Sequence, residues 1–429
     1  MRKMLTLLAC LFALNAAAAD FVRVKGTHFE REGRAYYVAG ANLWYGGYLG
    51  AAGKPGDRAR LAKELDALKA LGINNVRVLA VSERTAMPSA VKPATTSAPG
   101  RYDEQLLQGL DFLMAELAKR DMTVVLYLNN FWQWSGGMTQ YLNWFEGTPA
   151  IDPNITKDYE GFIAATARFY QSTKAQEEYR RVIRAIVQRT NTVTGKRYAE
   201  DTAIMAWQLA NEPRPGNSKA GMEEKASYVQ WIADTSAYIH GLDPNHLVST
   251  GSEGVIGSAR DAELFERAHR APGVDYLTYH LWPKNWGWVT SWDNAWAKSS
   301  AYLNAHIDAA KRLGKPIVLE EFGWDRDGGA FALSAGTTQR DRFYREVLET
   351  VASRAAKGDP IAGFNFWAWS GAGRAANADF WWKEGNDFLG DPPQEEQGLF
   401  SVFDSDAGTL AVLREYSARL TRLSKPLMP

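Results

Sequence analysis

The sequence has almost no cysteine and no excess of either charge. Cys10 is the single cysteine among 429 residues, and 49 Lys and Arg balance 49 Asp and Glu. If the chain is cut after residue 19, as expected below, the mature protein has no disulfide and no thiolate chemistry. The zero net charge argues against a broad basic surface for nucleic acid or for an anionic membrane.

Patterns typical of cofactor, metal and serine-nucleophile sites are missing as well. The five histidines other than His280 show no metal-ligand spacing, and no Gly-x-Ser-x-Gly turn is present. The segment 404–408 faintly resembles a calcium loop, but its glycine stands at the fifth place and not the sixth. We therefore expect neither a cofactor nor a metal.

The first 19 residues have the pattern of a signal peptide. Two basic residues at positions 2 and 3 precede an apolar run at 5–14, and alanines stand directly before Asp20. The apolar run is too short to span a membrane. We expect cleavage near Ala19, export to the periplasm or outside the cell, and no membrane anchor.

Tryptophan is abundant, with 16 residues. Its flat apolar face and single N–H donor suit stacking against the C–H face of a pyranose ring. Core packing explains part of this number. Several tryptophans, however, follow the expected strands described next, where core packing explains them less well.

Short apolar runs rich in β-branched and aromatic residues alternate with helical patterns after a hairpin at 21–38. This alternation predicts a parallel sheet, and eight strands are the number that closes a barrel. An open doubly wound sheet is the alternative, but residues 40–43 are not its glycine-rich phosphate turn. We expect an α/β protein with one (β/α)₈ TIM-barrel domain over 20–429, long βα loops and a monomeric state. The strands are expected at 38–43, 75–80, 123–129, 204–211, 247–250, 276–281, 317–322 and 363–369, and the helices at 58–71, 104–120, 175–189, 223–240, 295–312, 339–357 and 410–423.

Polar and aromatic residues stand at the carboxyl ends of these strands, where the active site of such a barrel forms. Two glutamates there, from the fourth and seventh strands, have the chemistry to break a glycosidic bond. One would protonate the leaving oxygen, and burial or the second carboxylate would raise its pKa. The other would stay ionised beside an arginine. The candidate residues are Trp44, Arg77, Asn129, Trp132, Asn211, Glu212, His280, Trp282, Glu321 and Trp367.

These residues, in this order, resemble glycoside hydrolase family 5, and the resemblance covers residues 20 to 423. Asn211-Glu212-Pro213 is similar to the family's acid/base motif, and Glu321-Phe322-Gly323 is similar to its nucleophile motif. The resemblance implies a retaining hydrolase with Glu212 as acid/base and Glu321 as nucleophile. It also implies that Asn211 contacts the sugar 2-hydroxyl and that His280 and Arg77 position the two carboxyl groups.

A narrower resemblance points to the β-mannanase branch of this family. It rests on residues 128–141, on Tyr279 to Pro283 and on residues 390–393. In many of these enzymes a tyrosine stands where this chain has Trp282. The resemblance implies endo-cleavage of β-1,4-linked mannan, galactomannan or glucomannan. An exo-acting mannosidase, a β-1,4-glucanase and a non-catalytic sugar-binding barrel remain alternatives, and loops near 44–57, 283–296 and 375–398 could block one end of a cleft and make the action exo.

Glu320 is the rival nucleophile. Since neighbouring side chains on a strand point to opposite faces, only one of Glu320 and Glu321 is expected to face the barrel interior. The Glu-Phe-Gly context favours Glu321. Glu320 is then expected between the barrel and its helices.

Overall fold

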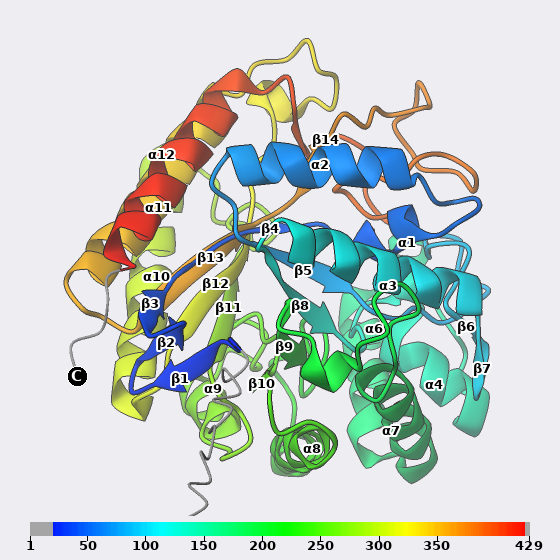
Figure 1. Ribbon diagram of the computed structural model, residues 1–429. Coiled ribbons are helices and arrows are strands. Elements are labelled where there is room, and N and C mark those ends of the chain that lie inside the picture. The colour runs from blue at the N-terminus through cyan, green and yellow to red at the C-terminus, as the bar shows by residue number, and fades with distance from the viewer. Residues whose placement is uncertain (1–19, 425–429) are drawn as a thin grey trace, which may run out of the picture.

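The computed structural model describes residues 20–424, and its centre is one parallel eight-stranded sheet (Figure 1). The strand order is β10-β9-β8-β5-β4-β13-β12-β11. A parallel bridge between Ser249 and Tyr276 joins the two ends of this order, so the sheet closes on itself. The strands are β4 (Val38–Asn42), β5 (Asn75–Leu79), β8 (Thr123–Tyr127), β9 (Ile204–Gln208), β10 (Leu247–Ser249), β11 (Leu277–Leu281), β12 (Ile317–Phe322) and β13 (Ile361–Phe366).

Helices follow the strands and cover the outside of the barrel. This is the expected (β/α)₈ TIM barrel of the α/β class. The long helices are α2 (Arg58–Ala70), α3 (Glu104–Lys119), α7 (Thr173–Val187), α8 (Met222–Leu242), α10 (Trp292–Leu313), α11 (Thr338–Ala356) and α12 (Ala407–Leu423). Shorter helices not predicted from the sequence are α1 (Gly46–Gly50), α4 (Gly137–Glu146), α5 (Pro153–Thr156), α6 (Tyr159–Thr166) and α9 (Ala262–His269).

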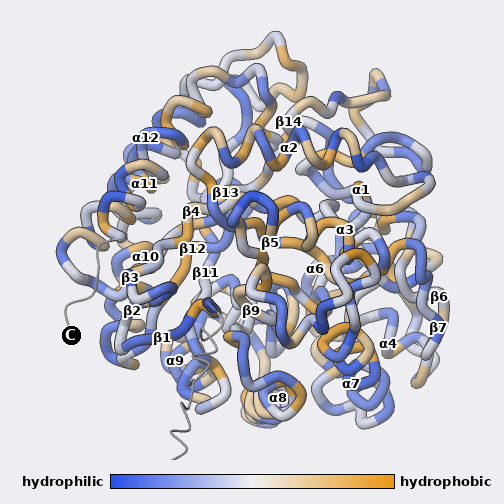
Figure 2. The backbone as a smooth tube through the Cα atoms, in the orientation of Figure 1, coloured by the Kyte–Doolittle hydropathy of each residue, from blue (hydrophilic) through white to orange (hydrophobic). Residues whose placement is uncertain are grey.

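Every residue of the eight barrel strands is buried, which is why the strands appear in the sequence as continuous apolar runs. Figure 2 shows hydrophobic colour concentrated on these strands and hydrophilic colour along outer helices such as α12. The larger apolar cluster runs through the barrel wall, the helices and the long loops. A smaller one, which includes Val125, Met205 and Val318, takes in residues of the N-terminal segment.

The N-terminal segment forms a small antiparallel sheet of β1 (Arg23–Lys25), β2 (His28–Arg31) and β3 (Arg34–Tyr36). Phe29 of β2 is fully buried and packs edge-on against Tyr276, at the start of β11. This sheet therefore lies at the amino ends of the barrel strands, which leaves the opposite end for the long loops. Two further strand pairs stabilise those loops: β6 (Thr96–Ala98) with β7 (Arg101–Tyr102), and β14 (Trp369–Gly371) with β15 (Val402–Phe403).

Within residues 20–424, no helix combines the length and apolar character needed to cross a membrane. The expected signal peptide at residues 1–19 lies outside the described residues and remains a prediction.

Candidate active site

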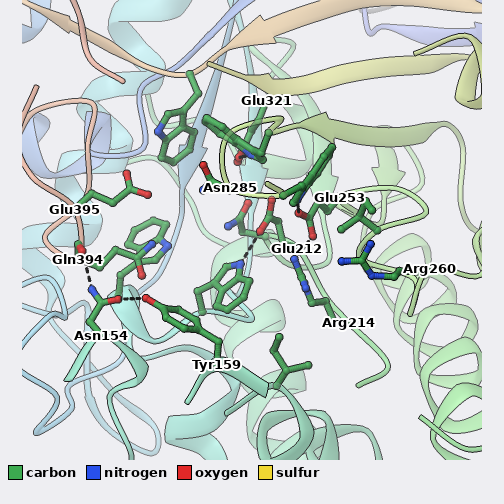
Figure 3. A pocket seen from close by; sticks show the side chains of 18 residues that line it. Asn154, Tyr159, Glu212, Arg214, Glu253, Arg260, Asn285, Glu321, Gln394 and Glu395 are labelled. Atoms are coloured by element: carbon green, nitrogen blue, oxygen red, sulfur yellow. Dashed lines mark hydrogen bonds and ion pairs between the residues drawn. The ribbon is translucent and has the colours of Figure 1, made fainter. Parts of the chain in front are cut away.

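A pocket of about 520 Å³ opens at the carboxyl ends of the barrel strands (Figure 3). Its wall combines aromatic rings with carboxyl, amide and guanidinium groups. Of the predicted residues, Trp132, Asn211, Glu212, Trp282, Glu321 and Trp367 line it. Wall residues not predicted as site residues are Trp134, Asn154, Tyr159, Ile163, Arg214, Glu253, Ile256, Arg260, Asn285, Trp286, Gln394 and Glu395.

Glu212 and Glu321 face one another across this pocket. A carboxylate oxygen of each and a ring nitrogen of His280 all lie within 4.8 Å of one another. His280 Nδ1 lies 2.6 Å from Glu212 Oε1 and 3.2 Å from Glu321 Oε2. The imidazole, which is fully buried, is therefore hydrogen-bonded to the first carboxyl group and close to the second.

The backbone holds Glu212 in an unusual conformation. Its φ is 49°, in the left-handed region that few residues other than glycine adopt. The Glu212 N–H donates to the carbonyl of Gly251 at 2.9 Å, and the Asn211 N–H donates to that of Asn129 at 2.9 Å. Such strain is retained where the surrounding structure imposes it, and it clusters at functional sites. Here it turns the carboxyl group at the end of β9 into the pocket.

The expected rise in the pKa of Glu212 is not found. Burial acts to raise the pKa, but hydrogen bonds from His280 and Trp132 and the charge of Arg214 outweigh it, so the pKa is lowered. Trp132 Nε1 donates to Glu212 Oε2 at 2.5 Å. The pKa prediction from the sequence rested on burial and on the second carboxylate. His280, Trp132 and Arg214, which lower the pKa, come from separate strands and loops.

Glu321 lies against a buried cation. Arg77 Nη1 donates to Glu321 Oε1 at 2.5 Å, and Trp282 Nε1 donates to Oε2 at 3.3 Å. Arg77 is fully buried and also donates to the amide oxygens of Asn42 at 3.1 Å and Asn211 at 2.7 Å. Trp282 therefore does supply a donor to Glu321, at the position where many similar sequences have tyrosine.

The prediction that Glu320 faces the helices is wrong. The pairing of β11 with β12 shifts between Tyr279 and His280, so that Leu319 pairs with Tyr279 and Glu321 pairs with His280. Glu320 is thus an extra residue in β12, and such a bulge interrupts the strict alternation of faces. Its carboxylate accepts from Gln208 Nε2 at 2.6 Å and lies 3.7 Å from Arg77 Nε, inside the barrel below Glu321.

Four predicted residues lie behind the pocket wall and do not line it. Arg77 and His280 contact the two carboxylates from below, as described above. Asn129 is buried, and its side-chain oxygen accepts the N–H of Asn130 at 2.7 Å. Trp44 is buried among aromatic rings, including Trp134, and donates to the carbonyl of Gly390 at 2.9 Å.

A second charged group lies beyond Glu212. Arg214 is ion-paired with Glu253, and its guanidinium carbon lies 4.9 Å from the ring centre of Trp132. Burial raises the pKa of Glu253 to about 7 although Arg214 opposes the rise, and Trp286 Nε1 donates to Glu253 at 2.9 Å. Arg214 directly follows Asn211-Glu212-Pro213 in the sequence. This position was the one sign in the sequence that the Arg214–Glu253 pair belongs to the site.

The opposite side of the pocket is lined by Gln394 and Glu395, from the loop between β14 and β15. Figure 3 shows Glu395 and Arg260 on opposite sides, with Glu212 and Glu321 between them. Burial raises the pKa of Glu395 well above its usual range, and its Oε2 has no hydrogen-bond partner within residues 20–424. Asn154 Nδ2, from α5, donates to the carbonyl of Gln394 at 2.6 Å and joins this loop to the segment after α4.

Comparison with known proteins agrees with this geometry. A family model described as "GH family 5 beta-mannosidase-like" matches residues 19–425. The chain belongs to glycoside hydrolase family 5. This membership makes it an enzyme that hydrolyses glycosidic bonds, on the barrel fold described above.

Individual relatives match most of the chain. Mannan endo-1,4-beta-mannosidase 3 of Oryza sativa is 32% identical over 364 residues, 81% of this chain and 72% of its own length. Mannan endo-1,4-beta-mannosidase 4 of Solanum lycopersicum is 28% identical over 416 residues, 94% and 92% of the two chains. The crystal structure of a family 5 mannosidase from Rhizomucor miehei is 35% identical with a TM-score of 0.86, covering 95% and 99%.

The charge of His280 predicts a pH-dependent stability. Burial alone would lower the pKa of His280, but the charge of Glu321 and the hydrogen bond with Glu212 outweigh it and raise the pKa to about 9. An unfolded histidine titrates near 6.5, so this contribution is fully present below about pH 6.5 and lost as the pH rises through about 9. His280→Gln should lower the free energy of unfolding, measured in urea. The loss relative to wild type should be about 3 kcal/mol larger at pH 6 than at pH 10.

His306→Gln is the matched control for this measurement. Burial lowers the pKa of His306 to about 4, so its ring is neutral across the same pH range. Because the unfolded ring is protonated at pH 6 and the folded ring is not, we expect its loss of stability to be about 1 kcal/mol smaller at pH 6 than at pH 10, opposite in sign to His280→Gln. A pH-independent loss for His280→Gln would contradict a charged imidazole between the carboxylates.

Proposed function

We propose that this chain hydrolyses β-1,4-mannosidic bonds with retention of configuration, with Glu212 as acid/base and Glu321 as nucleophile. One observation carries the proposal: carboxylate oxygens of the two residues lie within 4.8 Å of one another in one pocket. Retaining glycosidases separate their carboxyl groups by about 5–5.5 Å, and inverting ones by about 6.5–9.5 Å to admit a water. The shorter spacing supports direct attack by Glu321 on the sugar.

The first step needs an ionised nucleophile and an available proton. Arg77 and Trp282 donate to the two oxygens of Glu321 and so orient its carboxylate. The hydrogen bond between His280 Nδ1 and Glu212 Oε1 holds one proton, and its transfer to the carboxyl oxygen leaves a neutral imidazole and a protonated acid. Glu212 then protonates the leaving oxygen while Glu321 bonds to the anomeric carbon. In the second step Glu212 takes a proton from water, which displaces Glu321.

Aromatic and amide groups around the carboxylates would bind the sugar. Trp367 and Trp282 lie edge to face, with ring centres 6.1 Å apart, and offer a surface for the C–H face of a pyranose. Asn211 Nδ2 donates one hydrogen to Asn130 at 3.2 Å, and its second hydrogen is available for the sugar 2-hydroxyl. A bond to the 2-hydroxyl that strengthens in the transition state is expected of such enzymes.

Mannan is the substrate that the family relatives indicate. The relatives named above carry the names of mannan endo-1,4-beta-mannosidases, and a Rhizomucor miehei family 5 mannosidase was crystallised with mannosyl-fructose. We therefore propose mannan and manno-oligosaccharides as substrates, with a β-1,4-glucan as the alternative. Release of reducing sugar from carboxymethylcellulose but not from mannan would reject this choice. We also propose a monomer exported through the signal peptide at residues 1–19.

Exo action is a second candidate, and the side chains of Gln394 and Glu395 favour it. They line the pocket on the side opposite Arg214, which follows the proposed acid/base in the sequence. A donor side blocked by these two residues would admit one terminal sugar, whose hydroxyls would donate to Glu395 Oε2. Mannose and mannopentaose should then dominate the first products from mannohexaose, measured by chromatography. Mannobiose to mannotetraose without free mannose would instead support the endo mode.

A further inference from the structure

A buried carboxyl group outside the pocket makes an unusual set of contacts. Glu83 lies in the loop after β5, is 1% exposed and does not line the pocket. Its Oε2 accepts the backbone N–H of Gly137 at 2.8 Å, and its Oε1 accepts the hydroxyl of Tyr141 at 2.9 Å. Its own backbone N–H donates to the carbonyl of Ser135 at 2.7 Å. One residue thus makes three hydrogen bonds to the loop and helix that follow β8.

These contacts replace a missing helix cap. The N-cap position of α4 is occupied by Gly136, which has no side chain. The helix therefore has no hydrogen bond from an N-cap side chain. Glu83 accepts from the first residue of α4, where a negative group is favoured by the unpaired N–H groups of the helix start. A side chain at Gly136 would approach the Glu83 carbonyl to 2.3 Å. Glu83 and the loop are therefore packed together without space for adjustment.

The segment fixed in this way reaches the proposed acid/base. Gly137 is packed so closely that an added Cβ would lie 2.5 Å from the Asn130 carbonyl and 2.6 Å from that of Trp132. The Asn130 side-chain oxygen accepts from the Trp132 N–H at 3.1 Å and from Asn211 Nδ2 at 3.2 Å. The Trp132 indole then donates to Glu212 at 2.5 Å. A continuous series of contacts thus leads from Glu83 to Glu212 and Asn211.

We infer that Glu83 is a positioning residue: its buried carboxyl holds the loop 129–137 so that Trp132 orients Glu212. The inference rests on the proposed function, because it needs Glu212 to be the acid. A carboxyl group that served only the stability of α4 would slow all substrates alike through the fraction of folded protein. A positioning residue acts on proton transfer and so changes how the rate depends on the leaving group.

The test compares kcat/KM on mannotetraose with kcat/KM on 2,4-dinitrophenyl β-mannoside, whose phenolate leaves without protonation. Glu83→Ala should lower the first value about tenfold to a hundredfold and the second less than about threefold, since a general acid contributes on the order of 10²–10⁴-fold. Trp132→Phe should show the same selectivity, and the two changes together should be less than additive because they act on one contact. Glu83→Gln keeps an acceptor for Gly137 and a partner for Tyr141, and should restore nearly the wild-type ratio.

Two further variants separate this effect from folding. Glu178 is also fully buried and accepts a loop glycine N–H, that of Gly100 at 2.6 Å, but among the described residues its hydrogen bonds go to Gly100 and Arg181 and not to the loop 129–137. Glu178→Ala should lower the melting temperature and leave the ratio of the two kcat/KM values unchanged. If Glu83→Ala does not fold, Tyr141→Phe removes one donor to Glu83 and should give a smaller shift in the same direction.

The outcomes are distinct. Equal losses on both substrates, or none, in folded Glu83→Ala and Tyr141→Phe would overturn the inference while leaving the proposed function intact. A wild-type protein that cleaves neither mannoside would overturn the proposed function, and this inference with it.

Discussion

Glu321→Ala should lower kcat on manno-oligosaccharides by about 10⁵-fold, which corresponds to about 7 kcal/mol of activation free energy. Glu321 would form the covalent bond to the anomeric carbon, and the hydrogen bond from Arg77 orients it for that attack. Binding of the sugar should persist, because Trp132, Trp282 and Trp367 line the same pocket. Single-turnover kinetics would measure the rate, and quenching of tryptophan fluorescence would measure binding.

Azide identifies the role of Glu321 by stereochemistry. In Glu321→Ala the carboxylate is gone, so azide can occupy its place and attack the β-mannoside from the α face. The expected product is α-mannosyl azide, formed from an activated aryl mannoside. Formation of the β-anomer, or wild-type turnover in this variant, would contradict the assignment of the nucleophile.

Glu320→Gln is the matched control, since Glu320 is the adjacent carboxyl group and also lies near Arg77, at 3.7 Å. It lies below the pocket and does not line it. We expect a loss of stability because a buried acceptor for Gln208 is altered, but no azide rescue. Rescue of Glu320→Gln and not of Glu321→Ala would exchange the two roles.

The barrel and the two opposed carboxylates could be predicted because they depend on local patterns. Each buried strand is a short apolar run, and closure of a parallel barrel brings the carboxyl ends of all strands to one mouth. Glu212 and Glu321 lie 109 residues apart in the sequence, and barrel closure brings their carboxyl groups together. The same reasoning placed Arg77 and His280 near the two glutamates. It did not reveal that Arg77 and His280 lie behind the pocket wall.

The remaining site features depend on tertiary hydrogen bonds that no local pattern records. Glu320 faces inward because β12 has one residue more than β11 between paired positions. Glu395 reaches the pocket because the loop around it is folded about Asp391, whose carboxylate accepts the N–H groups of Gly398 at 2.7 Å and Phe400 at 2.8 Å. The pKa of Glu212 falls because donors from separate elements converge on it. Each of these is a property of the assembled fold.

Glu253 is the rival to Glu212 as the proton donor, and the comparison of their variants completes the test. Both carboxyl groups line the pocket, and the pKa of Glu253 is raised to about 7, a value suited to an acid at neutral pH. Glu253, however, is ion-paired with Arg214 and accepts from Trp286, so its oxygens are already engaged. Glu253→Gln should therefore affect mannotetraose and 2,4-dinitrophenyl β-mannoside to the same degree.

Glu212→Ala should instead separate these substrates strongly. Its kcat/KM on mannotetraose should fall about 10³-fold, because the sugar leaving group needs a proton, while kcat/KM on the dinitrophenyl mannoside should fall tenfold or less. The second step then lacks its base, so the glycosyl-enzyme should accumulate and release a burst of dinitrophenolate close to one equivalent per enzyme. Azide needs no base and would attack that intermediate from the β face, giving β-mannosyl azide, the opposite anomer to the Glu321→Ala product. Equal losses on both substrates, or an absent burst, would assign the proton to another group and remove the double displacement proposed for this pair.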